Sequence, residues 1–121
     1  MQKKTKGQIE AEISKALIQF EKEHMGRGPE DVRTYIIQDL VLIRLKGVLT
    51  PAEKSLAKDD EGVQLIKQVR SKLLENANNI LAKQITALTG FQIVSFHTDI
   101  STQTGERFII ITLEENLEQR L

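Results

Sequence analysis

One helical pattern of apolar residues dominates the sequence and runs from Gly62 to Thr89. A helix over residues 62–89 would be roughly 40 Å long at about 1.5 Å per residue, whereas a compact domain of this size has a radius of gyration of about 14 Å. We therefore expect part of the helix to extend beyond its own domain, where another chain would cover its apolar stripe. The alternative is a kink at Asn76-Ala77-Asn78-Asn79 that folds the helix back. The stripe comprises Val63, Ile66, Val69, Leu73, Ala77, Ile80, Gln84 and Leu88, widened by Leu65, Leu74, Leu81 and Ile85.

A shorter amphipathic helix precedes it near the start of the chain. Apolar residues recur there at four- and three-residue spacing, at Ile9, Ile13, Leu17 and Phe20. The helix should stop near Met25, because a Gly-Arg-Gly-Pro run over residues 26–29 cannot continue it. Residues 1–6 are expected to fray.

Between the two helices the apolar period changes to two, which predicts strands over residues 32–37 and 40–45. With Gln38-Asp39 as the turn, one face of the hairpin is mostly apolar, and its reverse face is apolar near the turn and basic further along. Such a reverse face is not an ordinary solvent face. On the first face we expect the pairs Ile36–Val41, Thr34–Ile43 and Val32–Leu45, and on the reverse face Ile37–Leu40, Tyr35–Leu42 and Arg33–Arg44.

The rest of the chain completes an α+β pattern. Thr50-Pro51-Ala52-Glu53 predicts a capping box at the start of a short helix. After the long helix, residues 91–97 and 107–113 alternate as a third and a fourth strand, and the apolar run 108–111 predicts a strand buried on both faces. Residues 114–121 form a short acidic tail. We expect a single domain, 1–121, with the order α-β-β-α-α-β-β and helices packed on a four-stranded, mainly antiparallel sheet of two hairpins.

Composition excludes several classes of function. The chain has no Cys, which excludes disulfides, thiolate metal sites and a Cys nucleophile. It has no apolar run long enough to span a membrane, and its lysine-rich start lacks the apolar stretch of a signal peptide. Its 17 basic residues balance 17 acidic ones, which argues against a nucleic-acid binder. We expect a soluble cytoplasmic protein with no cofactor, no metal, no nucleic-acid partner and no direct membrane insertion.

A polar segment from His97 to Glu106 is the main candidate for chemistry. It is longer than a hairpin turn requires, and His97 and Asp99 would share a face of an extended chain. Three interpretations stay open: local stabilisation of a loop by its own side chains, binding of a ligand or partner, and catalysis. A metal site would need Glu106 as a third ligand across the hairpin. The candidate ligand-binding residues are His97, Asp99, Ser101, Thr102, Thr104 and Glu106.

Two basic features have weaker functional interpretations. Arg27 and Gly28 in the glycine-rich turn, together with Arg33, could bind an anion, although the turn follows a helix and a simple helix stop explains it as well. Arg33, Arg44 and Lys46 form a basic patch beside Tyr35, where an RNA-reading sheet would carry more aromatic residues. A solvated or interfacial face explains the patch better.

Three separated motifs together resemble one bacterial family. They are the Gly-Arg-Gly-Pro turn over residues 26–29, the segment Gly47-Val48-Leu49-Thr50-Pro51-Ala52-Glu53-Lys54-Ser55-Leu56-Ala57, and the polar segment 97–106. As a set, in this order, they resemble the family named after MpsC, a component of a sodium-translocating, membrane-potential-generating system, and the resemblance runs from about residue 5 to residue 116. It implies a small cytoplasmic accessory protein associated with membrane proteins that handle ions or inorganic carbon. It supplies no catalytic residues.

Two functional hypotheses follow. The first is a non-enzymatic accessory or regulatory module, a homodimer with a possible membrane-protein partner, that works by protein contact. The second is a small ligand- or metal-binding protein or enzyme that uses the 97–106 segment. The interface residues expected under the first hypothesis are Tyr35, Ile37, Leu40, Leu42, Leu73 and Ile80.

Overall fold

A computed structural model describes residues 4–121 of the chain and confirms the α+β class and the predicted order of elements. Residues 1–3 of the segment expected to fray lie outside the described part. The main elements are α1 (Lys6–His24), β1 (Asp31–Ile37), β2 (Leu40–Lys46), α2 (Pro51–Leu56), α3 (Asp60–Thr89), β3 (Ile93–Ser101) and β4 (Glu106–Leu113), followed by the short 3-10 turn η1 (Leu117–Arg120).

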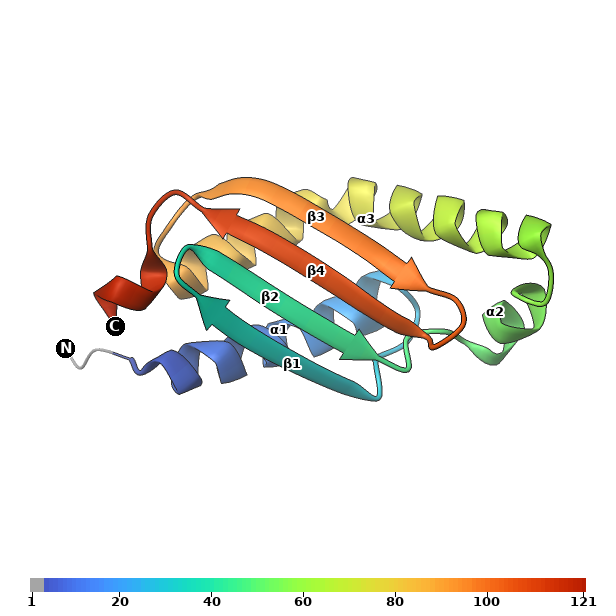
Figure 1. Ribbon diagram of the computed structural model, residues 1–121, viewed down its shortest axis with the longest axis horizontal. Coiled ribbons are helices and arrows are strands. Elements are labelled where there is room, and N and C mark those ends of the chain that lie inside the picture. The colour runs from blue at the N-terminus through green and yellow to red at the C-terminus, as the bar shows by residue number, and fades with distance from the viewer. Residues whose placement is uncertain (1–3) are drawn as a thin grey trace.

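The four strands form one antiparallel sheet in the order β1-β2-β4-β3. Both long helices lie on the same side of this sheet, and in Figure 1 the opposite side faces the viewer with no helix of residues 4–121 across it. We call the uncovered side the outer face. The arrangement therefore gives the sheet one face buried against helices and one face open to contact.

The predicted β1–β2 hairpin is confirmed residue by residue, with Ile36 opposite Val41 and Tyr35 opposite Leu42. Alternation accounts for this result, because only one register points the apolar set of both strands to the same side. The two-residue turn is possible without glycine because Gln38 adopts a left-handed backbone conformation, with φ of 57°.

The core lies between the inner face of the sheet and the two helices. Side chains from α1, from α3, from the inward positions of β1, β2 and β4 and from the segment before α2 are almost completely buried there. The largest are Phe20, Ile13, Leu17, Ile36, Ile43, Leu45, Leu49, Leu81, Ile85, Ile109 and Ile111.

The long helix α3 corrects one expectation. It is a single unbroken helix of 30 residues, so the kink at 76–79 does not form. The helix also packs against its own domain along its whole length, since buried positions recur along it from Gly62 to Thr89. Figure 1 shows why: the molecule is elongated, α3 lies close to its long axis behind the oblique strands, and α2 packs beside the end of α3 that passes the sheet. The estimate from the radius of gyration failed because it treats the domain as a sphere.

The polar segment 97–106 is a second correction. The strand β3 continues to Ser101, and only Thr102–Gly105 form the turn to β4. His97 pairs with Ile110 and Asp99 with Phe108 in the sheet ladder. The hairpin connection is therefore of ordinary length, and its polar residues belong mostly to an exposed edge strand rather than to a long loop.

Helix ends follow the sequence signals. Thr50 and Glu53 form the predicted capping box of α2, and Met25 follows the last residue of α1. Lys6, in the segment expected to fray, is the first residue of α1, capped by Thr5. At the other end of the chain, Leu117 in the acidic tail is buried in the core. Within residues 4–121, no helix combines the length and the apolar character that crossing a membrane requires.

Candidate functional site

The outer face of the sheet is an apolar surface that the helices of residues 4–121 leave uncovered. Its centre is built from outward positions of β1, β2 and β4, which alternate with the buried ones. Tyr35 is 45% exposed, Ile37 46% and Ile110 38%. Leu40, Leu42 and Phe108 are half-buried between them.

The expected burial of the 108–111 run on both faces is correct only for its inward residues. The strand β4 is central, as predicted, and Ile109 and Ile111 are buried. Ile110 is exposed and Phe108 only half-buried on the outer side. Exposed apolar residues gathered on one face, rather than scattered, are the signature of an interaction surface.

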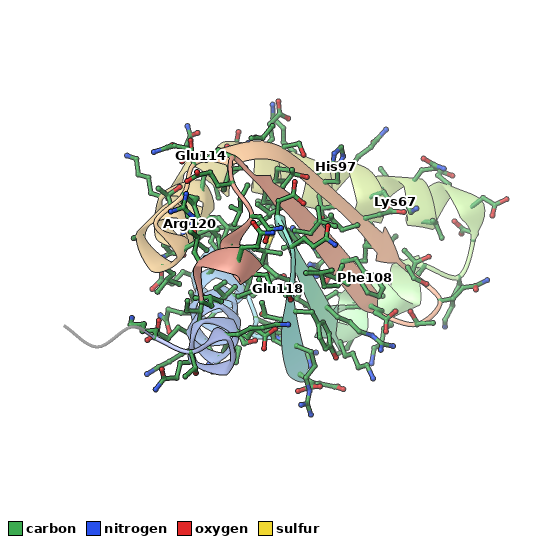
Figure 2. The ribbon with its side chains drawn as sticks, turned by 60° about the vertical axis from the view of Figure 1, so that its left-hand side comes forward. Lys67, His97, Phe108, Glu114, Glu118 and Arg120 are labelled. Atoms are coloured by element: carbon green, nitrogen blue, oxygen red, sulfur yellow. The ribbon has the colours of Figure 1, made fainter. Side chains whose placement is uncertain are left out.

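Charged groups flank the apolar centre at both ends. At the end where β1 begins, Arg44 pairs with Glu106 at 2.6 Å and lies over the Phe108 ring at 5.8 Å, and Arg33 and Lys46 are exposed. Asp39 in the β1–β2 turn and Glu114 after β4 lie at the other end. Figure 2 shows Phe108 on this face and Glu114 beyond the end of β4. Both ends therefore carry carboxylates, because Asp31 and Glu106 lie with the basic residues at the first end.

A second apolar surface lies on α3. Four of its large apolar side chains are exposed at a spacing that keeps them on one flank of the helix. They are Leu65 at 44%, Val69 at 55%, Leu73 at 39% and Ile80 at 45%. The two α3 residues expected at an interface, Leu73 and Ile80, are therefore available for contact.

The residues of the 97–106 segment do not converge on one centre. His97, Asp99 and Ser101 alternate along the outward side of β3, while Thr102 and Thr104 lie in the turn. Ser101 and Thr104 satisfy backbone N–H groups of this turn, as the loop-stabilising interpretation requires: the hydroxyl of Ser101 accepts from Thr104, and that of Thr104 accepts from Glu106. Glu106 is held by Arg44.

No set of three or more His, Asp or Glu side chains within residues 4–121 is arranged to hold a metal ion. Along the hairpin, His97 pairs with Ile110, four ladder positions from the pair of Ser101 with Glu106. The third ligand that the metal interpretation needed is therefore not beside the first two.

The residues of the weak anion site serve different contacts. Arg27 donates to the carbonyl oxygens of Leu49, at 3.1 Å, and of Gly28, at 3.4 Å. It ties the turn after α1 to the segment before α2. Arg33 lies on the outer face beside Asp31, at 3.4 Å. The Gly-Arg-Gly-Pro turn therefore ends the helix and anchors a neighbouring loop.

Sequence reasoning missed two buried ion pairs. Arg107 of β4 donates to Glu21 of α1 at 2.9 Å, with side-chain exposures of 4% and 1%. Arg70 of α3 binds Glu53 through two nitrogens at 2.7 Å each. The sequence does indicate that Glu21 is buried, because Glu21 follows Leu17 by four residues and so falls on the apolar stripe of its helix.

The local environment shifts the titration of these carboxyl groups in opposite directions. Burial raises the pKa of Glu21 and outweighs the lowering by Arg107 and Arg70. Burial also acts to raise the pKa of Glu53, but the hydrogen bonds from Arg70 and from the Thr50 backbone lower it overall. The Glu53 carboxylate is thus stabilised as an anion, whereas that of Glu21 is destabilised.

These features define a small α+β protein whose single sheet is covered by helices on one side and carries an apolar surface on the other. The chain belongs to the family described as "Na+-translocating membrane potential-generating system (MpsC)", whose model matches residues 5–115.

Two proteins of Bacillus subtilis (strain 168) are similar to this chain. "Uncharacterized protein YbcI" is 46% identical over 119 residues, which cover 98% of this chain and 96% of the relative. "Uncharacterized protein YrhF" is 21% identical over 113 residues, which cover 90% of each. No solved structure matches.

Proposed function

We propose that this protein is a non-enzymatic cytoplasmic accessory or regulatory protein that works through protein contact, with the outer face of the sheet pairing with a second copy of the chain. The observation that carries the proposal is the exposed apolar centre of that face, with Tyr35, Ile37 and Ile110 each more than a third exposed. Water contact with such a patch is unfavourable, and packing two sheets face to face removes it.

A two-fold arrangement brings the apolar centres of two copies of the face together. A two-fold axis that crosses the strands places the end with Arg33 and Lys46 over the end with Asp39 and Glu114 of the other copy. The apolar centres then meet in the middle, and Lys46 of one copy lies at the rim near the carboxylates of the other, while Arg33 and Arg44 keep their own partners Asp31 and Glu106. This geometry is typical of isologous dimers and makes the second copy the occupant that we favour.

The exposed flank of α3 supports the accessory role. In a dimer that uses the outer face, Leu65, Val69, Leu73 and Ile80 remain on the helix side of the sheet. We assign this flank to a membrane-protein partner, as the description of the family suggests for an ion-translocating system. The role is regulation or assembly by contact, since the chain's own helices within residues 4–121 provide no membrane span.

The test is sedimentation of the wild type and two matched variants. Ile110→Lys places a charge in the centre of the outer face, whereas Leu56→Lys makes the same change on α2 at a comparable exposure of 46%. We expect the wild type and Leu56→Lys to sediment as dimers and Ile110→Lys as a monomer with unchanged circular dichroism, because a buried unpaired charge is costly.

Two results would contradict the proposal. One is a wild-type protein that sediments as a monomer at micromolar concentration, and the other is an Ile110→Lys variant that remains dimeric. A variant with Leu73→Lys tests the α3 assignment separately: it should stay dimeric and lose a membrane protein that the wild type retains.

A further inference from the structure

A cavity lies at the end of the molecule where three segments far apart in the sequence meet. Its volume is about 620 Å³, and its walls come from the end of β2, from α2 and from the turn between β3 and β4. Figure 1 shows these three segments gathered at one end of the sheet. Parts of two motifs singled out in the sequence, residues 47–57 and 97–106, therefore border one cavity. Neither the apolar centre of the outer face nor the exposed flank of α3 lines it.

Hydrogen bonds within the chain hold the walls of this cavity in place. The Val48 N–H donates to the carbonyl oxygen of Gly105 at 3.1 Å, which joins the segment before α2 to the β3–β4 turn. Arg27 donates to the carbonyl oxygen of Leu49 at 3.1 Å, and Leu49, which lines the cavity, is 1% exposed. The cavity is therefore largely preformed, as binding sites for small molecules usually are.

Both carboxylates that line the cavity already have an arginine partner. Glu106 lies 2.6 Å from Arg44, and Glu30 lies 3.8 Å from Arg27. Glu30 reaches the wall across Gly47, where a Cβ atom would lie 2.4 Å from the Glu30 carboxyl carbon. The negative charge of the wall is thus balanced by residues of the same chain.

The two lysines that line the cavity have no such partner. Lys46 at the end of β2 and Lys54 on α2 are both exposed. Neither takes part in an ion pair within residues 4–121. The charge that remains available to a ligand is therefore positive, which favours an anion.

The turn between β3 and β4 adds uncharged hydrogen-bonding groups. The hydroxyl oxygen of Thr104 accepts from the Glu106 N–H, so its own proton is free to be donated. Thr102 supplies a second hydroxyl group and Gln103 a side-chain amide. None of the described residues that line the cavity is aromatic, so the wall offers no ring on which a nucleotide base could stack.

We propose that this cavity binds a hydroxylated organic phosphate, of which a sugar phosphate is the simplest example. Lysine is a point charge suited to phosphate, whereas the planar guanidinium group of Arg44, which would grip a carboxylate, is occupied by Glu106. Lys46 and Lys54 would bind the phosphate group, and the amide of Gln103 would bind hydroxyl groups of the sugar. The volume lies within the range of about 300–1,000 Å³ that is typical of small-molecule sites and exceeds what an inorganic ion needs.

The test titrates isotope-labelled full-length protein with glucose 6-phosphate at constant ionic strength. We expect saturable shifts of the backbone amide signals of residues 46–49, 54–57 and 102–106. Lys54→Gln should weaken binding about threefold to tenfold, the effect of losing one charged contact. Lys58→Gln removes the same charge from an exposed position four residues further along, outside the cavity, and should leave binding unchanged.

Gln103→Ala separates recognition of the sugar from recognition of the phosphate. It should weaken the binding of glucose 6-phosphate and leave that of inorganic phosphate unchanged, because the amide is assigned to the sugar. The proposal is overturned if glucose 6-phosphate causes no saturable shift at these amides, if Lys54→Gln and Lys58→Gln behave alike, or if inorganic phosphate or glucose alone binds as tightly as the sugar phosphate. The inference does not rest on dimerisation: Ile110→Lys, a change outside the cavity, should bind glucose 6-phosphate as the wild type does.

Discussion

Replacing Arg107 by Met isolates the energetics of the buried ion pair. Met is similar in length to the apolar stem of Arg but leaves the Glu21 carboxylate, 1% exposed, without the hydrogen bond that Arg107 donates to it. The Oε2 atom of this carboxylate already lacks a partner among residues 4–121 of the wild type. Removing one partner of a buried pair costs about 3–5 kcal/mol. Since small domains have about 5–15 kcal/mol of stability in total, the variant should fold but unfold at much lower urea concentration.

The loss should depend on pH in a defined direction. Burial raises the pKa of Glu21 in the native wild type even with Arg107 and Arg70 nearby, and removing Arg107 should raise it further. A group whose native pKa lies above its unfolded value, about 4.3 for Glu, binds its proton more tightly in the folded state. Its penalty is therefore full above the native pKa and disappears as the pH falls toward the unfolded value. The stability gap between wild type and Arg107→Met should be widest at neutral pH and should narrow in acid.

Urea unfolding followed by circular dichroism measures this gap, since the chain contains no Trp for fluorescence. The double variant Glu21→Met/Arg107→Met removes both charges and should recover most of the loss, because apolar replacement of a whole buried pair is often neutral. The exposed pair Arg120–Glu115, 2.8 Å apart, provides the control: Arg120→Met should cost no more than about 1 kcal/mol. A cost for Arg107→Met within this control range, or a gap that is constant from acid to neutral pH, would refute the reasoning.

Two further predictions concern helix starts. Gly62→Ala should destabilise the protein by about 1–3 kcal/mol or more, because its Cβ would lie 1.6 Å from the carbonyl oxygen of Leu56. Gly7→Ala, whose Cβ would have no heavy atom within 4 Å, should stabilise the protein by up to about 1 kcal/mol. Thermal unfolding compares the two variants, and equal shifts in melting temperature would contradict the prediction. Thr50→Ala removes the hydroxyl group that accepts from the Glu53 N–H at 3.2 Å and should lower the stability by about 1 kcal/mol. Backbone hydrogen exchange should become faster in α2 only. An unchanged exchange rate in α2 would be evidence against this cap.

The parts of the fold that sequence predicted well are those in which one local rule acts alone. The β1–β2 register followed from alternation, and the start of α2 from the capping box. The extension of β3 to Ser101 was missed because an exposed edge strand has no need for apolar residues on its outward side, where His97 and Asp99 lie. A signal was present in the inward residues Phe96 and Ile100, which keep the period of two across the polar segment.

The candidate sites were harder to predict because they depend on which elements meet. The sequence alone could place Tyr35 and Leu42 on the reverse face of the hairpin. That this face is exposed depends on the packing of both long helices against the other side of the sheet. A small pocket between α3 and β3 needs Arg70 from α3 beside Arg107 from β4, and each residue alone resembles a solvated charge. Both arginines can be recognised in the sequence by their spacing from buried apolar residues. Arg70 is four residues from Ile66 and from Leu74, and Arg107 is two residues from Ile109, so each occupies a core position of its helix or strand. Because a charge in phase with a buried stripe must find a partner inside the protein, such a position indicates an internal polar site even where no sequence motif accompanies it.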